Sequence, residues 1–474
     1  MVMGEFTQET QLLVLGGGPG GYAAAFRAAD LGLDVTLVDA AGRLGGVCLY
    51  RGCIPSKTLL YVTELLHDAR RAENMGLSFG APRIDLDAMR AWKNRVIEKL
   101  AGGLGELAAR RGVQLVKGRA VFEGSDRVRI LDSDVAHIKF RHAVIATGSR
   151  AITIPVAKEV RGGSVMTSTG ALALADIPQR LLVVGGGYVG VELGLVYASL
   201  GSRVTMVEDS DRIMSGADAD LVQPLIQRLQ EVFDAIYTRT RVKQLRETES
   251  GVEAVFNGNG HGERQCFDRV LVAIGRRSNS ENLGLENTRV KCDERGFIEV
   301  DEQMRTADER IFAVGDVVGG VMLAHKAMHE GKVAAEVIAG KEVAFDYLAI
   351  PAVVYTDPQI AWCGLTEQEA KRQNRSVRVT RFPWSASGRA ATMGLAKGMT
   401  KFIIDEPTGR ILGMGIVGRE AGEMISEGVL AVEMGALAED VAFSMHPHPT
   451  LSESEEEAAE AFLGSSTHIL PAKK

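Results

Sequence analysis

The sequence has few cysteines, no basic cluster and no long apolar run. Five cysteines in 474 residues are too sparse, and odd in number, for a structural disulfide framework. Lys and Arg number 54 against 61 Asp and Glu, a net charge of -7 without a basic block that could follow a phosphate backbone. Polar residues or glycine turns interrupt every apolar stretch before the ~18 residues that a membrane span needs. We therefore expect no nucleic-acid partner, no membrane insertion and no disulfide-stapled scaffold.

The N-terminal decapeptide MVMGEFTQET has no basic residue and leads into no signal-peptide core. With so few cysteines, this predicts a protein of the reducing cytoplasm. The composition, 46% hydrophobic and 24% charged, is that of soluble globular domains. At roughly 100 to 200 residues per domain, the length indicates about three domains rather than one.

An internal repeat dominates the sequence. QLLVLGGGPGGYAAAFRAADLGLDVTLVD, residues 11–39, aligns without a gap on RLLVVGGGYVGVELGLVYASLGSRVTMVE, residues 180–208. Each copy reads as a short apolar strand, a glycine turn, a helix, and a second strand that ends in an acid. This is one βαβ unit used twice. It predicts an α/β protein with two Rossmann-like domains, each with a doubly wound parallel sheet.

The remaining pattern divides the chain further. A strand precedes Ala146, Thr147 and Gly148 after the first copy, and another precedes Ala273, Ile274 and Gly275 after the second, so these look like matched domain exits. IFAVGDVVG and the helical segment after it come next, and from about Tyr347 extended and then helical segments predict an α+β domain. We expect two dinucleotide-binding domains at 1–150 and 151–278, a central segment at 279–346 that completes the first site, and a C-terminal domain at 347–474.

The first copy carries the G-x-G-x-x-G spacing at Gly16, Gly18 and Gly21. The first glycine permits a tight turn, the second lets a pyrophosphate approach the backbone, and the third allows close contact between helix and strand. Asp39, at the end of the second strand, is placed to hold a ribose hydroxyl. Glycine turns that merely close βα units are the alternative, and equal spacing in both copies makes that alternative weak.

The second copy repeats the arrangement at Gly185, Gly187, Gly190 and Glu208. A carboxylate at Glu208 would repel the additional phosphate of NADP, whereas an arginine would attract it. The second site is therefore predicted to prefer NAD.

Two cysteines come directly after the first copy, in GGVCLYRGCIPSK. Cα atoms five residues apart in a regular α-helix are separated by roughly 8.6 Å, beyond the ~7 Å limit for a disulfide. Cys48 and Cys53 can couple only if the helix is distorted, and Gly52 and Pro55 supply that irregularity. Amides of the following helix would stabilise a thiolate. A C-x4-C pair without further ligands is a poor metal site, so we expect no metal.

The other three cysteines, Cys266, Cys292 and Cys363, stand far apart in the sequence and are interpreted as incidental small thiols.

Near the C-terminus, MHPHPTLSESEEE contains a histidine between two prolines and a carboxylate five residues later. His448 with Glu453 predicts a general base of raised pKa that could take a thiol proton. An alternative remains open, because Thr450 and Glu453 also match a T-x-x-E capping box at the start of a helix. His446 is interpreted as a spare.

Six motifs occur in the order and at the separations typical of the dihydrolipoamide dehydrogenase family, flavin-dependent disulfide reductases that regenerate lipoyl groups. They are GGGPGGY, GGVCLYRGCIPSK, IATG, GGGYVGVELG with its terminal acid, FAVGDV and HPTLSE, and the resemblance extends over nearly the whole chain. It implies FAD in the first domain, NAD in the second, and a C-terminal domain that forms a homodimer. It also implies lipoyl domains of a 2-oxo acid dehydrogenase or glycine cleavage complex as partners.

The resemblance assigns roles as well. Cys48 would be the interchange thiol that meets dihydrolipoamide, and Cys53 would lie against the flavin, pass the electron pair to it and give a charge-transfer contact when reduced. His448 and Glu453 would come from the partner chain, and FAD would pass hydride to NAD. Lys57 would lie near the flavin's reactive nitrogen, paired with Glu192, and an aromatic side chain would cover the flavin until nicotinamide enters. The candidate cofactor-binding residues are Gly16, Gly18, Gly21, Asp39, Lys57, Thr147, Gly148, Asp316, Gly185, Gly187, Tyr188, Gly190, Glu192, Glu208 and Gly275.

Some positions depart from the family's usual residues. Asp39 replaces a Glu, Val47 a Thr, Tyr50 an Asn and Arg51 an aliphatic residue, and Ser278 takes the place of a Pro. The first four concern flavin contacts and substrate entry rather than the class of reaction.

Three other interpretations are weaker. Glutathione-type reductases share the cysteines and the histidine but ordinarily place arginines where this chain has Glu208. Mercuric reductases usually carry a C-terminal cysteine pair, which SSTHILPAKK lacks, and soluble transhydrogenases lack one or both redox cysteines. A flavoprotein redox sensor without turnover could keep both nucleotide folds, but the intact set of Cys48, Cys53 and His448 argues against it.

Overall fold

The first sheet contains the first copy of the repeat. The structure is a computed structural model that describes residues 7–160, 162–258 and 264–470. Strand order is β3-β2-β1-β6-β5-β4, with β17 paired to β6, and β1, β2, β3, β6 and β17 run parallel. The strands are β1 (Thr7–Leu15), β2 (Val35–Asp39), β3 (Gln114–Lys117), β4 (Arg119–Gly124), β5 (Arg127–Leu131), β6 (His137–Ile145) and β17 (Ile311–Ala313). Because both faces of this sheet are covered, β2 and the second half of β1 are almost fully buried apolar runs.

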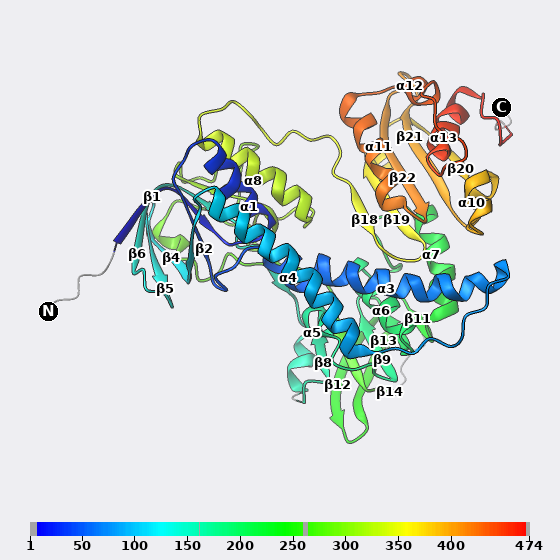
Figure 1. Cartoon of the computed structure of the whole chain (residues 1–474), viewed down its shortest axis with the longest axis horizontal. Helices are drawn as coiled ribbons and strands as arrows, with labels where there is room; N and C mark the ends of the chain where they lie inside the picture. Colours follow the sequence, from blue (N-terminus) through cyan, green and yellow to red (C-terminus); the bar gives the residue numbers. More distant parts are fainter. Residues whose placement is uncertain (1–6, 161, 259–263, 471–474) are drawn as a thin grey trace.

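Helices α1 (Pro19–Asp30) and α8 (Ala324–Ile338) lie side by side against this sheet (Figure 1). Glycine permits their close approach, because a Cβ added at Gly331 would stand 2.3 Å from the carbonyl oxygen of Gly20. This packing brings the start of α8 to the glycine turn of the first copy.

The second sheet contains the second copy and is entirely parallel, in the order β11-β10-β9-β15-β8. Its strands are β8 (Val165–Thr167), β9 (Arg180–Val184), β10 (Arg203–Val207), β11 (Ala235–Tyr237) and β15 (Arg269–Val272). A three-stranded antiparallel sheet lies beside it, formed by β12 (Thr240–Thr248), β13 (Gly251–Gly258) and β14 (Arg264–Phe267). The associated helices are α5 (Ser168–Ala173), α6 (Tyr188–Ser199) and α7 (Ala219–Val232). The two copies of the repeat thus fold as two βαβ units, as predicted.

The two predicted exits pair with one another. Strand β7 (Ser149–Ala151) comes after the first exit and β16 (Arg276–Ser278) after the second, and they form a two-stranded antiparallel ribbon. The backbone therefore connects the two nucleotide-binding units directly.

The cysteine segment forms α2 (Gly46–Arg51) and α3 (Cys53–Arg71), and α4 (Leu86–Arg110) is the next helix. Helix α3 packs against α6 and runs on toward the C-terminal sheet (Figure 1). There Asp68 accepts two hydrogen bonds from Arg419, at 2.9 and 3.0 Å.

The C-terminal part is the α+β unit that the sequence predicts. Its antiparallel sheet has the order β18-β19-β22-β21-β20, with α11 packed on β19 and β22 and α13 on β20 and β21. The strands are β18 (Ala352–Val354), β19 (Gln359–Gly364), β20 (Val377–Pro383), β21 (Met399–Asp405) and β22 (Ile411–Gly418), and the helices are α9 (Glu367–Arg372), α10 (Gly388–Thr392), α11 (Ala421–Met434), α12 (Ala438–Ala442) and α13 (Glu453–Leu463).

Short 3-10 helices complete the secondary structure: η1 (Ala72–Met75), η2 (Pro155–Glu159), η3 (Leu285–Asn287), η4 (Gly315–Val318) and η5 (Trp384–Ala386). No helix in the three described ranges is both long enough and apolar enough to cross a membrane. The predicted fold class, two Rossmann-like units and a C-terminal α+β unit, is confirmed.

Candidate active site

The first glycine turn has the geometry of a phosphate-binding loop. Gly16 has φ +107°, which favours glycine, and a Cβ added at Gly21 would stand 1.8 Å from the carbonyl oxygen of Gly16. A Cβ added at Gly18 would meet nothing within 4 Å, so this backbone faces open space. Asp39 closes the turn, because its Oδ2 accepts the Gly17 N–H at 2.9 Å.

The second turn repeats these features closely. Gly185 has φ +110°, and an added Cβ at Gly190 would stand 2.1 Å from the oxygen of Gly185. Gly187 faces open space, as Gly18 does. Glu208 takes the role of Asp39, since its Oε2 accepts the Gly186 N–H at 2.6 Å. Both turns can therefore admit a pyrophosphate against the backbone at the start of a helix.

Each turn borders a cavity. The first cavity has a volume of about 390 Å³, and the second about 670 Å³, both within the range of small-molecule and cofactor sites. The predicted residues that line the first cavity are Gly16, Gly18, Asp39, Cys48, Cys53, Lys57, Thr147, Gly148, Tyr188, Glu192 and Asp316. Those that line the second are Gly185, Gly187, Tyr188, Glu208 and Gly275. Gly21 and Gly190 line neither, because they act in helix–strand contact behind the turns.

The structure brings the two cysteines together. Helix α2 ends at Arg51 and α3 begins at Cys53, and Gly52 between them has φ −147° and ψ −113°, so the predicted distortion is confirmed. The two sulfurs are not bonded covalently and share a hydrogen bond.

The two thiols differ in acidity. The hydrogen bond from Cys48 is the largest cause that lowers the pKa of Cys53 to about 7, and Lys57 and the backbone amide act in the same direction against the effect of burial. The pKa of Cys48 is raised, because it gives that hydrogen bond and is partly buried. When the pair is reduced, Cys53 is therefore the thiolate and Cys48 keeps its proton.

Lys57 and Glu192 form the predicted pair. The Lys57 ammonium lies 2.8 and 3.0 Å from the two carboxylate oxygens of Glu192, whose side chain is almost fully buried. Glu192 also accepts the backbone N–H of Tyr355 at 3.0 Å, and the Tyr355 ring lies under the ammonium at 4.7 Å. The lysine is thus held in the wall of the first cavity within electrostatic range of Cys53.

Two side chains border both cavities. Tyr188, the first residue of α6, lies between them and is 41% exposed, so its ring has room to move. Arg276, which sequence reasoning missed, donates from Nε to the hydroxyl of Ser149 at 2.7 Å. The same hydroxyl contacts Asp316, and Arg276 Nε lies 3.6 Å from that carboxylate. Asp316 is therefore oriented by residues from both exits.

Two further arginines line the second cavity and were also missed. Arg241 forms a bidentate ion pair with Asp209, and Arg212 donates to the carbonyl of Ser215 at 2.8 Å. Both guanidinium groups are thus held by partners in the wall that also contains Glu208. No sequence motif predicted either arginine.

His448 and Glu453 are paired, away from the first cavity. The His448 Nδ1 lies 2.7 Å from the Glu453 carboxylate, and the imidazole is 73% exposed. Neither residue lines the first cavity. They belong to the C-terminal unit, in the segment after α12 and at the start of α13, whereas residues of α1, α2, α3, α6 and α8 line the first cavity.

The capping-box alternative is wrong in its essential bond. The hydroxyl of Thr450 donates to the carbonyl of Pro447 at 2.8 Å and does not cap the helix, which begins at Glu453 after Ser452. One half of the motif survives, since Glu453 Oε2 accepts the Thr450 N–H at 2.6 Å. Glu453 therefore fixes both the loop and the imidazole of His448. His446, interpreted as a spare beside the candidate base, has its own carboxylate partner, Glu427, at 2.9 Å.

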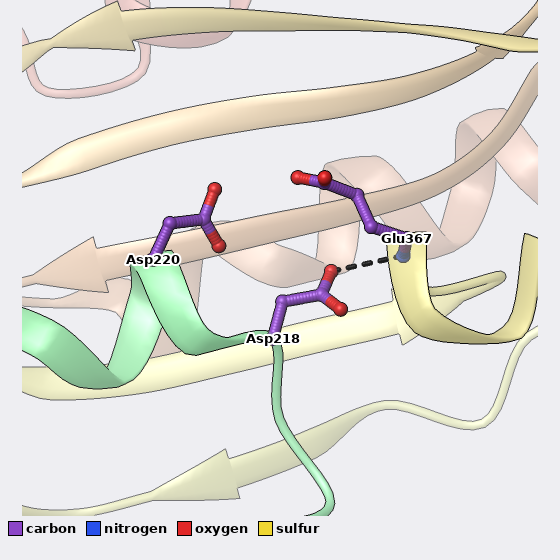
Figure 2. Close-up of side chains that lie close together, drawn as sticks. All are labelled: Asp218, Asp220 and Glu367. Atoms are coloured by element: carbon purple, nitrogen blue, oxygen red, sulfur yellow. Dashed lines mark hydrogen bonds between the residues drawn. The ribbon is translucent and has the colours of Figure 1, made fainter. Parts of the chain in front are cut away.

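One acidic cluster of the described residues has the spacing of a cation site. The carboxylates of Asp218, Asp220 and Glu367 point toward a common position (Figure 2). The ammonium of Lys401 occupies it, at 2.8, 2.8 and 2.9 Å from the three groups, and Lys401 is fully buried. The cluster is an ion-pair network that connects the start of α7 with α9 and β21.

Comparisons with known proteins agree with this geometry. The family described as pyridine nucleotide-disulphide oxidoreductase matches residues 10–331, and its dimerisation domain matches residues 350–459. A dihydrolipoyl dehydrogenase of Haemophilus influenzae is 45% identical over 467 residues, covering 98% of this chain and 97% of the relative. One of Geobacillus stearothermophilus is 45% identical over 471 residues, covering 99% of this chain and 100% of the relative.

Solved structures share the fold. LpdA from Mycobacterium tuberculosis superposes with a TM-score of 0.88 at 27% identity, over 95% of this chain and 99% of that one. The HOCl-induced flavoprotein disulfide reductase RclA from Escherichia coli has a TM-score of 0.84 at 26% identity, over 95% and 99%.

Proposed function

The chain belongs to the pyridine nucleotide-disulphide oxidoreductase family, and on that basis we propose that it is a dihydrolipoyl dehydrogenase. The reaction is oxidation of a dihydrolipoyl dithiol to the disulfide, with reduction of NAD. The observation that carries the proposal is the Cys48–Cys53 pair, which lies at an interrupted helix in the wall of a dinucleotide cavity.

FAD fits the first cavity and NAD the second, because each has a glycine turn with open backbone and an acid at the end of the following strand. When bound, FAD supplies a two-electron carrier between the dithiol and NAD. Gly18 and its neighbours hold the flavin nucleotide's pyrophosphate, and Asp39 holds its ribose. Gly187 and Glu208 do the same for NAD.

Other predicted residues surround the reactive part of the first cavity. Thr147, Gly148 and Asp316 lie on its wall, and Lys57 provides a cation held by Glu192. Tyr188 separates the two cavities and moves aside when nicotinamide enters. Gly275, in the wall of the second cavity, leaves room for NAD to enter.

Cys48 carries the exchange with substrate. A substrate thiolate attacks the Cys48 sulfur of the Cys48–Cys53 disulfide, so a mixed disulfide forms and Cys53 leaves as a thiolate. The second substrate thiol then attacks its own sulfur in the mixed disulfide, releasing oxidised lipoyl and the Cys48 thiol. Cys53 suits the leaving role because the Lys57 ammonium and a backbone amide both favour its thiolate.

His448 accepts the substrate protons. Since Glu453 accepts only a donated hydrogen bond, the His448 Nδ1 carries the proton and Nε2 is free to act as the base. The carboxylate also stabilises the imidazolium that forms.

The chain carries the family's dimerisation domain. A second copy supplies His448 and Glu453 to the cysteines of the first, which is supported by the absence of both residues from the lining of the first cavity within one chain. Phe443 and Met445, in the segment just before His448, are large apolar side chains that are exposed, and they support a contact surface there. The partners in turnover are lipoyl domains of a 2-oxo acid dehydrogenase or glycine cleavage complex, in the cytoplasm.

An anaerobic assay tests this function. The FAD-loaded protein is mixed with dihydrolipoamide and NAD, and NADH is followed by absorbance. We expect steady turnover, and after two-electron reduction a long-wavelength absorbance from the Cys53 thiolate beside flavin. A flavin-loaded protein that forms no NADH from dihydrolipoamide would reject the function and favour a redox sensor.

A further inference from the structure

A buried carboxyl group lies directly beneath the loop of His448. Glu455, in the first turn of α13, is completely buried, and among the described residues no donor group bonds to either of its oxygens. A buried polar group without a partner is costly, and an ionised one far more so. Glu455 has no part in the disulfide chemistry described above, so its presence needs another explanation.

The group within reach of Glu455 is the carboxylate of Glu427 on α11. Glu427 binds His446, because the His446 Nε2 lies 2.9 Å from the Glu427 Oε1. His446 Nδ1 lies 2.7 Å from the carbonyl oxygen of Ser444, which can only accept. Both imidazole nitrogens therefore donate, so His446 is a cation and Glu427 an anion. The pKa of His446 is accordingly raised, first by its hydrogen bond to Glu427.

Two carboxyl groups in contact can share a hydrogen bond only when one of them is protonated. Burial first, and then the charge of Glu427, raise the pKa of Glu455 to about 9. The remaining groups nearby do not neutralise it: Cys363 on β19 is a buried thiol, Glu433 on α11 is acidic, and Glu456 lies 3.4 Å from His446. Glu455 is thus the proton-bearing member of a chain that runs from α13 through α11 to the loop.

The same helix turn holds both histidines. Glu453 binds His448. Glu455 contacts Glu427, which binds His446, the histidine two residues before His448 in the loop. We propose that protonated Glu455 is a positioning residue for the His448 loop, and that loss of its proton releases the loop by placing two carboxylates against each other in the interior. The role for catalysis rests on the proposed function, in which His448 is the base.

The predicted pH dependence has a definite sign. A carboxyl group whose pKa is raised on folding contributes stability that is present at low pH and is lost as the pH rises toward the raised value. Glu455→Gln keeps the shape and a hydrogen-bond donor toward Glu427 but cannot ionise. The FAD-loaded variant should therefore lose less stability than the wild type between pH 7 and pH 10. Glu439→Gln, an exposed Glu-to-Gln change on the neighbouring helix α12, is the matched control and should behave as the wild type.

Two measurements decide the proposal. The first is the thermal midpoint of the three FAD-loaded proteins between pH 6 and pH 10. The second is the rate at which dihydrolipoamide reduces the flavin anaerobically over the same range. We expect the alkaline limb of this rate to move up by about one pH unit in Glu455→Gln, so the variant is on the order of 10-fold faster than wild type on that limb. If Glu455→Gln does not fold, Glu455→Leu takes its place with the same expectation.

The outcomes are distinguishable. Superimposable wild-type and variant curves in both measurements overturn the proposal, and a changed midpoint profile with an unchanged rate profile overturns the positioning role. If no protein reacts with dihydrolipoamide, the proposed function fails, while the thermal midpoints still decide whether Glu455 carries the pH-sensitive proton.

Discussion

The two βαβ units of this chain have nearly identical glycine turns but lead into different helices. In each, the chain returns over the glycine turn and donates one backbone hydrogen bond to it: Gly45 N–H to Gly17, at 2.7 Å, and Met214 N–H to Gly186, at 2.9 Å. After the first return comes the interrupted helix with both cysteines, and after the second comes α7 with the acids that surround Lys401. The glycine motif therefore specifies only the binding of a dinucleotide. The helix that follows it differs: in the first unit it carries the redox cysteines, and in the second it carries acids that bind the C-terminal sheet through Lys401.

The largest effect should come from the redox helix. Cys48→Ser removes the sulfur that substrate attacks, so dihydrolipoamide turnover should be abolished while NADH still reduces the flavin. Steady-state assay and anaerobic NADH titration of the same sample separate the two. Residual lipoamide turnover would mean that Cys48 is not the interchange thiol. The helix after the first glycine turn would then not differ from that after the second by carrying the redox chemistry.

The fastening role of the second unit should appear as a large loss of stability. Lys401→Met removes the buried cation of the cluster; Arg381 still pairs with Asp220 and Glu367, but Asp218 is left buried without a cation. This loss should cost about 3 to 5 kcal/mol of the free energy of unfolding. Asp68→Ala breaks the corresponding contact between α3 and Arg419, a pair that is partly exposed, and should cost ~1 kcal/mol or less. Denaturant unfolding monitored by circular dichroism compares them. Equal losses would show that neither unit is preferentially fastened to the C-terminal sheet.

The base should matter only to the thiol half of the reaction. His448→Ala should slow flavin reduction by dihydrolipoamide on the order of 10²-fold, because the substrate thiols lose their proton acceptor. Flavin reduction by NADH, which uses the second unit, should be unchanged and is the internal control. Stopped-flow absorbance measures both, and an unaffected thiol step would remove His448 from the mechanism.

Paired glycine substitutions test whether the two turns hold different nucleotides. Gly21→Ala and Gly190→Ala each place a Cβ against a backbone oxygen, a clash that should cost about 1 to 3 kcal/mol. We expect the first variant to lose FAD during purification and the second to retain FAD but show a raised KM for NAD. Gly102→Ala in α4, where a Cβ would meet nothing, is the control. The reverse pattern would exchange the cofactor assignments.

The smallest effect should come from Glu208, the acid that follows the second glycine turn. Glu208→Gln keeps the hydrogen bond with Gly186 and removes the charge, so the preference for NAD over NADP should fall by roughly 10-fold, a change of about 1.4 kcal/mol. Arg212 and Arg241 already line this cavity and would face the additional phosphate. The ratio of kcat/KM for the two nucleotides is the measurement. An unchanged ratio would show that Glu208 does not set the preference.

Sequence reasoning succeeded where spacing alone determines geometry. The repeat predicted both glycine turns, and the separation of Cys48 and Cys53 required the break that the structure places at Gly52. The pairing of Lys57 with Glu192, 135 residues apart, came from resemblance and not from any local pattern.

The contacts that the sequence could not predict join distant segments. Arg276 meets Ser149 across 127 residues, and Lys401 meets Asp218 across 183. No periodicity or spacing marks such partners. The capping-box alternative at Thr450 failed for a different reason: the helix begins at Glu453 after Ser452, so Glu453 is the first helical residue and not the third, as the box requires.

The short ribbon of β7 and β16 has a consequence for how this protein can change over evolutionary time. It joins the two nucleotide-binding units through main-chain hydrogen bonds, at the point where Arg276 reaches both cavities. The spacing between the electron donor and the electron acceptor therefore depends on backbone groups, which all residue types except proline carry in full. Side chains around either nucleotide can drift, and specificity can be retuned, while the gap that electrons must cross stays the same.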